Sequence, residues 1–281
     1  MESGDPLVTA DWLKQHISAP DIRVVDATWF ASFQNSDKSG REAWSAGHIP
    51  GAVHFDIDAI KATDTDLPHM LPDPILFSSR VRKLGIGDGN RVIVYDQNGY
   101  CAAPRVWWML RVMGHNDVKV LDGGLKAWTD AGGALEDMPP MPTERHFTAR
   151  VRSDLVKDAA QVRAASDAGN FTIVDARPAT RFTGKAPEPR EGLASGHIPG
   201  SLNVPSATLV HDDGTFKSTA ELKALLPATG KPVITTCGSG VTASTLALAY
   251  ARTGNWDVAV YDGSWTEWAS DASRPVATGA A

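Results

Sequence analysis

Residues 233–251 read VITTCGSGVTASTLALAYA. The stretch begins with four β-branched residues, which are typical of a buried strand, and ends with an apolar run at 244–251 that is typical of a helix. Cys237 is the first residue between the two, and it is followed closely by Gly238 and Gly240. The pattern therefore predicts a strand, a tight loop and a helix, with a thiol on the first residue of the loop.

The loop itself has the composition of an anion-binding cradle. Glycine adopts backbone angles that other residues resist, so Gly238 and Gly240 allow several N–H groups to turn toward one point. The N-terminus of the following helix adds the positive end of its dipole. We expect this cradle to hold the Cys237 thiolate, or a persulfide formed on it. A buried and inert core cysteine is the alternative, but such a residue needs no glycines beside it.

The chain repeats a set of short motifs in the same order. The recurring landmarks, given in pairs, are GHIPG at 47–51 and 196–200, VDA at 25–27 and 174–176, DGG at 122–124 and DGS at 262–264, and Trp128 and Trp268. The repeat is much longer than the roughly 20–50 residues that separate the units of solenoids and propellers. It therefore predicts two tandem domains, with both tryptophans in their cores.

A chain of 281 residues is long enough for two domains that each bury a core. We expect the first domain at 1–135, a linker at 136–149 and the second domain at 150–281. The linker contains PPMP at 139–142, and these prolines cannot continue a helix or a central strand. A stiff, extended connection between the domains follows from this composition.

Short apolar strands alternate with helical patterns in both halves. Strands are expected at 23–27, 92–95, 118–121, 172–176, 233–236 and 258–261. Helices are expected at 9–17, 104–113, 158–166 and 219–226, and Ser218 followed by Glu221 has the form of a capping box. Continuous apolar strands between helices predict the α/β class, with a parallel sheet flanked by helices in each domain.

The segment CGSGVTA at 237–243 resembles the active-site loop of the rhodanese-like sulfurtransferases, and most of all that of the 3-mercaptopyruvate sulfurtransferase branch. The thiosulfate branch typically carries two basic residues where this chain has Gly238 and Ser239. The resemblance covers nearly the whole chain and implies two tandem rhodanese-like domains. No cysteine or histidine pair has the spacing of metal ligands and no nucleotide-binding fingerprint follows a strand, so we expect neither metal nor other cofactor.

By that resemblance the reaction is a transfer of sulfane sulfur in two steps. The Cys237 thiolate takes sulfur from 3-mercaptopyruvate, and pyruvate leaves. The resulting persulfide passes its outer sulfur to a thiophilic acceptor such as cyanide, a small thiol or thioredoxin. The repeat places Asp96 opposite Cys237. Because a carboxylate cannot accept sulfane sulfur, we expect the first domain to be catalytically silent.

Arginines follow the end of the strand expected at 172–176, at the sheet edge where open α/β sheets bind ligands. The resemblance maps substrate-binding arginines onto Arg181 and Arg190. 3-Mercaptopyruvate carries a carboxylate, which a guanidinium matches with two parallel hydrogen bonds. A solvated or salt-bridged arginine is the alternative for each. For Arg177 a further alternative is pairing with Asp175 or another acidic group, which would hold the loop.

The same resemblance makes Ser239 and His48 a pair that handles a proton, oriented by Asp37. The alternative for His48, and the interpretation favoured for His197, is that the ring anchors the loop of its GHIPG motif. The loop residues expected to contact the substrate are Gly238, Ser239, Gly240, Val241 and Thr242.

Three other functions share parts of this pattern. Thiosulfate is the alternative donor, but its two negative charges meet no positive side chain at Gly238 or Ser239. Cysteine phosphatases close a similar loop with an arginine at the position where this chain has Ala243. A non-catalytic sulfur carrier or binding module is the third alternative, and an assay with a sulfur donor separates it from an enzyme.

Charge and composition narrow the partners and the compartment. A net charge of −6 and the absence of any Lys/Arg-rich run argue against a nucleic-acid partner. No stretch of about 18 apolar residues exists, so no membrane span is expected. The first residues lack the pattern of a secretory signal, and Cys101 and Cys237 alone form no disulfide scaffold. We therefore expect a cytoplasmic protein whose partners are a small sulfur donor and a thiol acceptor.

Overall fold

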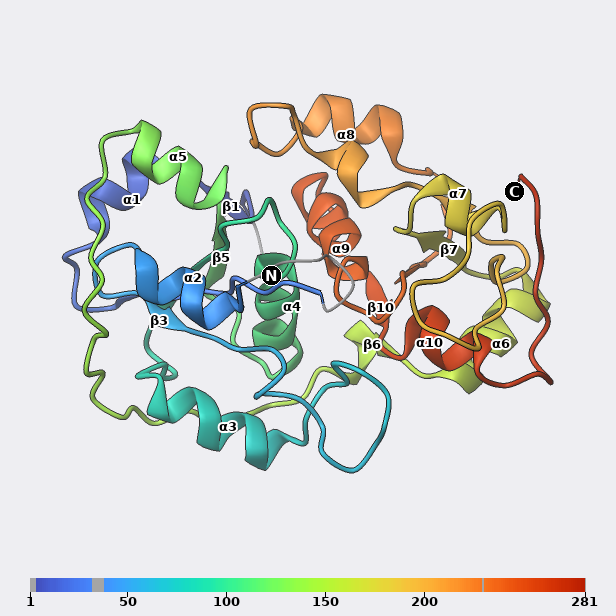
Figure 1. Ribbon diagram of the computed structural model, residues 1–281, viewed down its shortest axis with the longest axis horizontal. Coiled ribbons are helices and arrows are strands. Elements are labelled where there is room, and N and C mark those ends of the chain that lie inside the picture. The colour runs from blue at the N-terminus through green and yellow to red at the C-terminus, as the bar shows by residue number, and fades with distance from the viewer. Residues whose placement is uncertain (1–3, 32–37, 229, 281) are drawn as a thin grey trace. The chain divides into compact units, whose positions relative to one another are not determined.

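The computed structural model describes residues 4–31, 38–228 and 230–280 (Figure 1). The chain divides into two compact units. The first contains the residues up to Thr63 together with Leu71–Arg152 and Val210–Phe216. The second contains Asp64–Met70, Ser153–Leu209 and the residues from Lys217 onward. Apart from the two short segments that are exchanged, each unit corresponds to one half of the sequence, and the linker bounds at 136–149 stay a prediction.

The first unit is built on a five-stranded sheet in which every pairing is parallel. Its strands, in spatial order, are β1 (Leu7–Val8), β5 (Val118–Leu121), β4 (Arg91–Tyr95), β2 (Ile22–Asp26) and β3 (Val53–His54). Its helices are α1 (Ala10–His16), α2 (Gly40–Ala46), α3 (Pro74–Lys83), α4 (Ala103–Val112) and α5 (Gly124–Asp130). The fully buried helix α4 follows the central strand β4.

The second unit repeats this topology. Its strands, in spatial order, are β6 (Val156–Lys157), β10 (Ala259–Tyr261), β9 (Val233–Thr236), β7 (Thr172–Asp175) and β8 (Leu202–Asn203). Its helices are α6 (Ala159–Ala168), α7 (Ala179–Phe182), α8 (Thr219–Leu225), α9 (Ala243–Arg252) and α10 (Ser264–Ala269). The sheet is again entirely parallel, with β9 at its centre. The predicted fold class, two α/β domains with parallel sheets flanked by helices, is confirmed.

The central strands were predictable from the sequence, whereas the outer ones were not. All six expected strands are present, and their ends differ by no more than one residue from the prediction. The four unpredicted strands, β1, β3, β6 and β8, have two residues each and lie at the sheet edges. Two residues are too few to produce a pattern of burial, so only tertiary pairing reveals them. The capping box of α8 is confirmed, since Ser218 and Glu221 exchange hydrogen bonds.

The repeated motifs mark equivalent points of the two cores. Ile49 and Ile198, from the two GHIPG segments, are fully buried in the two hydrophobic clusters. Trp128 and Trp268 lie in the same clusters, and each indole N–H donates to a backbone carbonyl, that of Ala134 at 2.8 Å and that of Pro275 at 2.9 Å. Among the described residues, no helix is both long and apolar enough to cross a membrane.

The loop after β4 is an anion cradle that contains its own anion. Asp96, the first residue after β4, is only 3% exposed. Its carboxylate accepts hydrogen bonds from the backbone N–H groups of Tyr100 at 2.9 Å, Ala102 at 3.0 Å and Ala103 at 2.9 Å. Burial raises the pKa of the Asp96 carboxyl, and the three N–H groups oppose that shift. In the first unit, the loop equivalent to the Cys237 loop of the second unit is therefore filled by the Asp96 carboxylate.

This arrangement predicts a stability defect in Asp96→Ala. The substitution leaves three buried N–H groups without an acceptor, so the free energy of unfolding of the first unit should fall by about 3 kcal/mol or more. Calorimetric melting of the full chain measures the change. Asp130→Ala, which removes an exposed carboxylate of α5, is the control and should melt as the wild type does. Equal melting of the two variants would contradict the structural role given to the Asp96 carboxylate.

Candidate active site

Cys237 lies immediately after the central strand β9 and is 2% exposed. Its N–H donates to Ser264 Oγ at 3.2 Å, and its carbonyl accepts from the N–H of Trp265 at 3.0 Å. Both partners belong to the first turn of α10. Strand β9 on one side and α10 on the other therefore hold the Cys237 backbone in one position.

Ser264 is a contributor that the sequence alone did not identify. Its φ is +51°, in the left-handed region that non-glycine residues avoid at a cost of about 1 kcal/mol or more. The equivalent residue of the first unit is Gly124, with a φ of +56°. The serine in the second unit uses its hydroxyl twice, because Oγ accepts from Cys237 and donates to the Tyr261 carbonyl at 2.7 Å. The only sequence signal was the change from DGG to DGS between the repeats.

In the loop after Cys237, a backbone carbonyl accepts hydrogen bonds, whereas several backbone N–H groups have no acceptor among the described residues. The Gly238 carbonyl accepts from the N–H of Thr266 at 2.9 Å and from its hydroxyl at 2.6 Å. Gly240 has a φ of +77°, which permits the turn into α9. No hydrogen bond joins the N–H groups of Gly238, Ser239, Val241 and Thr242 to any other residue in the described part of the chain.

Arg181 and Arg190 converge on this loop. A Cβ atom added to Gly238 would lie 3.3 Å from Nη2 of Arg181 and 3.9 Å from Nη1 of Arg190. The structure thus brings both predicted arginines beside the residue that follows Cys237. Their guanidinium groups place positive charge where Gly238 and Ser239 themselves supply none.

Arg181 is fixed by a carboxylate that lies below the surface. Glu188 has a side chain only 2% exposed, and it accepts from Arg181 Nε at 3.2 Å and also from Nη2. The same carboxylate accepts from Arg177 Nη1 at 2.8 Å. Glu188 therefore joins the two arginines, and its role could not be inferred from an irregular loop without periodicity.

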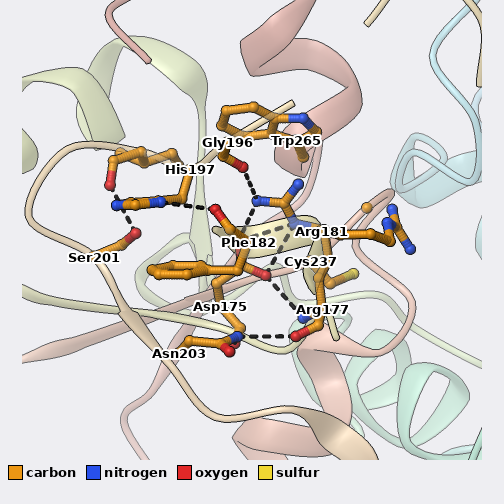
Figure 2. Close-up of polar contacts among 12 residues, drawn as sticks. Asp175, Arg177, Arg181, Phe182, Gly196, His197, Ser201, Asn203, Cys237 and Trp265 are labelled. Atoms are coloured by element: carbon orange, nitrogen blue, oxygen red, sulfur yellow. Dashed lines mark hydrogen bonds and ion pairs between the residues drawn. The ribbon is translucent and has the colours of Figure 1, made fainter. Parts of the chain in front are cut away.

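Arg177 pairs with Asp175, one of the options left open for it. Its guanidinium contacts both Asp175 carboxylate oxygens, at 2.6–3.1 Å, and donates to the Gly196 carbonyl at 2.8 Å. Figure 2 shows it next to the Trp265 ring, whose centroid is 4.3 Å away. Burial alone would lower the pKa of Arg177, but Asp175 and Glu188 outweigh burial and raise it. Arg177 is thus a permanently charged anchor inside the second unit.

The proposed proton-handling residues have different surroundings. Ser239 is largely buried, and its hydroxyl makes no hydrogen bond to another described residue. His48, in the first unit, is fully buried, with Nδ1 2.9 Å from the Trp44 carbonyl and Nε2 3.6 Å from Glu136. Asp37 lies outside the described residues. The pairing of Ser239 with His48 and Asp37 stays a prediction, and the contacts of His48 favour a loop anchor.

His197, the counterpart of His48, anchors its own loop. Its Nδ1 lies 2.8 Å from the Phe182 carbonyl, and its ring stacks on the Phe182 ring with centroids 3.8 Å apart (Figure 2). Within the described residues, no group of three or more histidine, cysteine, aspartate or glutamate side chains is arranged to hold a metal ion. Cys101 is partly exposed, in the loop that contains the Asp96 cradle.

Comparison with known proteins gives a consistent family assignment. A model of the rhodanese-like domain matches residues 9–131 and 158–271. The chain is 43% identical to 3-mercaptopyruvate sulfurtransferase of Escherichia coli K12 over 96% of either chain. It is also 40% identical to thiosulfate sulfurtransferase of Rattus norvegicus over 93% of this chain and 91% of that one.

A solved structure agrees over most of the chain. The crystal structure of SseA, a 3-mercaptopyruvate sulfotransferase of Escherichia coli, superimposes with a TM-score of 0.85 at 40% identity. The match covers 93% of this chain and 99% of that one. Family model, relatives and structure together show that the chain belongs to the rhodanese family and is a sulfurtransferase with two rhodanese-like domains.

Proposed function

We propose that the chain transfers sulfur from 3-mercaptopyruvate through a persulfide on Cys237. The observation that carries this proposal is the convergence of Arg181 and Arg190 on Gly238, next to the thiol. A 2-oxo acid with sulfur on its third carbon holds its carboxylate a few bonds from the reacting atom. Arginines beside the loop suit such a donor, because they bind the carboxylate while the sulfur faces Cys237.

The first half-reaction is a displacement at sulfur. The Cys237 thiolate attacks the donor sulfur, an S–S bond forms and the C–S bond breaks. The electron pair of the broken bond goes to the pyruvate enolate, which then takes a proton at carbon. The loop N–H groups of Gly238, Ser239, Val241 and Thr242 stabilise negative charge on the cysteine sulfur and then on the persulfide.

In this proposal the enolate takes up the proton that the donor thiol carried, the Ser239 hydroxyl relays it, and the persulfide is left as an anion. Ser239 adjoins Gly238, and its hydroxyl has no other hydrogen-bond partner among the described residues. The family resemblance adds His48 and Asp37 to this path. Because both ring nitrogens of His48 face groups of the first unit, we rest the proton step on Ser239 alone.

The second half-reaction returns the enzyme to its starting state. A thiophilic acceptor such as cyanide, a small thiol or thioredoxin attacks the outer sulfur, and the Cys237 thiolate leaves. The first domain contributes no acceptor of its own, since Asp96 occupies the position of the nucleophile and its carboxylate is bound by three N–H groups. A reactive free thiol suits a reducing compartment, so we keep the cytoplasm as the expected location.

Donor kinetics test the proposal. The wild type should have a higher kcat/KM for 3-mercaptopyruvate than for thiosulfate. Arg181→Ala should lower kcat/KM for 3-mercaptopyruvate about ten- to a hundredfold, because charge-assisted hydrogen bonds contribute roughly 1.5–3 kcal/mol. Arg163→Ala, on the exposed face of α6, is the matched control and should leave turnover unchanged.

Alkylation of Cys237 by iodoacetamide separates substrate binding from thiol reactivity. This reagent is neutral and has no carboxylate, so its rate should change far less than turnover in Arg181→Ala. Parallel losses would show that the arginine acts on the thiolate and not on the substrate. A wild type that prefers thiosulfate would contradict the donor assignment, and one that turns over neither donor would favour a sulfur carrier.

Gly238→Ala tests the convergence of the arginines. The new methyl group would lie 3.3 Å from Arg181 Nη2, and Glu188 restrains that guanidinium from moving away. We expect KM for 3-mercaptopyruvate to rise about tenfold. The same change in an Arg181→Ala background should add little, because the contact is already gone. An equal rise of KM in both backgrounds would contradict the contact. The control is Gly89→Ala, because a Cβ atom added at Gly89 would have no atom within 4 Å.

A further inference from the structure

Glu188 is the point at which the arginines of the second unit meet. Its side chain is 2% exposed, and one of its carboxylate oxygens accepts from both Arg177 Nη1, at 2.8 Å, and Arg181 Nε, at 3.2 Å. The other oxygen accepts from Arg181 Nη2. Among the described residues, the hydrogen bonds to this carboxylate all come from the two guanidinium groups.

Glu188 is itself held in a fixed position. Arg177 is bound by Asp175 and by the Gly196 carbonyl, and its guanidinium lies against Trp265. The Arg177 side chain is 1% exposed. A guanidinium with these partners has little freedom to rotate, so it fixes the carboxylate of Glu188 that it contacts.

The contact with Glu188 determines which hydrogen-bond donors of the Arg181 guanidinium remain available to a ligand. Glu188 occupies the Nε–Nη2 edge, one of the two edges with which a guanidinium grips a carboxylate. The donors that remain are on Nη1 and on the outer side of Nη2, the atom nearest to Gly238. Glu188 therefore aims the remaining donors of Arg181 at the Cys237 loop.

Glu188 also limits the positive charge beside the thiol. Arg181 and Arg190 bring two charges to the loop, and the negative charge of Glu188 offsets one of them. The electrostatic attraction between one positive charge and a dianion is twice that between the same charge and a monoanion at the same distance. A site with reduced positive charge therefore favours a monocarboxylate over a dianionic donor.

We propose that Glu188 is a positioning residue that sets the choice of donor, by aiming Arg181 at the substrate carboxylate and by offsetting its charge. This inference rests on the proposed function. The competing explanation is a buried ion pair that only stabilises the loop, and the two differ in what happens to the ratio of donors.

The test compares Glu188→Gln with Glu191→Gln, which removes an exposed carboxylate three residues along the same loop. In Glu188→Gln we expect kcat/KM for 3-mercaptopyruvate to fall about tenfold, mainly through KM. We expect the ratio of thiosulfate to 3-mercaptopyruvate turnover to rise about tenfold or more, because the loop gains one unit of positive charge. The Glu191→Gln variant should keep the wild-type ratio. Equal losses with both donors would overturn the proposal and leave a structural ion pair.

Removal of one partner from a buried ion pair can prevent folding, so Glu188→Asp supplies a second variant. Aspartate keeps the charge but is one methylene shorter, and it cannot reach both arginines as Glu188 does. We expect kcat/KM for 3-mercaptopyruvate to fall about tenfold, while thiosulfate turnover and the iodoacetamide rate at Cys237 stay near wild type because the charge is kept. Unchanged turnover in Glu188→Asp would overturn the positioning role.

A binding measurement distinguishes failure of this inference from failure of the proposed function. Pyruvate and sulfate donate no sulfane sulfur, and either can protect Cys237 from iodoacetamide by occupying the site. In Glu188→Gln, protection by pyruvate should weaken and protection by sulfate should strengthen, whatever donor the enzyme uses. The wild type could prefer thiosulfate while Glu188→Gln still weakens protection by pyruvate and strengthens protection by sulfate. That result would contradict the proposed donor but would support the role of Glu188. If protection does not change, the role of Glu188 fails.

Discussion

The site depends on how the backbone N–H groups are satisfied where the chain turns after the central strand of each sheet. Buried N–H groups without an acceptor cost about 1–3 kcal/mol each. In the first unit, the Asp96 carboxylate accepts from three of them. In the second unit, Cys237 stands at the same place, and four N–H groups of its loop have no acceptor among the described residues. The N–H donors that a carboxylate occupies in the first unit are therefore without an acceptor beside Cys237 in the second.

The chemistry of the second unit follows from a chain of fixed charges. Asp175 and Trp265 hold Arg177, Arg177 holds Glu188, and Glu188 directs Arg181 to the residue after Cys237. The members of this chain other than Arg181 are nearly inaccessible to solvent. Such preorganisation would lower the entropy cost of orienting the carboxylate of the proposed donor. It also explains how a loop without basic side chains can present positive charge to its substrate.

The sequence predicted what depends on buried patterns or on repetition. The central strands were found because their apolar runs are continuous. Cys237 was found from the glycine loop between a strand and a helix, and Asp96 and the core tryptophans because the two halves align. The edge strands, Ser264 and Glu188 were not found. Glu188 acts through contacts between loop residues at irregular spacing, and Ser264 through a backbone angle, so neither leaves a periodic signal. The pairing of His48 with Ser239 was an implication of family resemblance, and the burial of His48 gives it no support.

A single-turnover experiment tests the central claim that Cys237 takes sulfur covalently before any acceptor binds. Enzyme in excess is mixed with limiting 3-mercaptopyruvate in the absence of an acceptor, and pyruvate is measured together with the intact mass of the protein. The account predicts one pyruvate for each sulfur atom added to Cys237, and neither product with Cys237→Ser. Sulfur that maps to Cys101, or pyruvate that forms only after an acceptor is added, would contradict it.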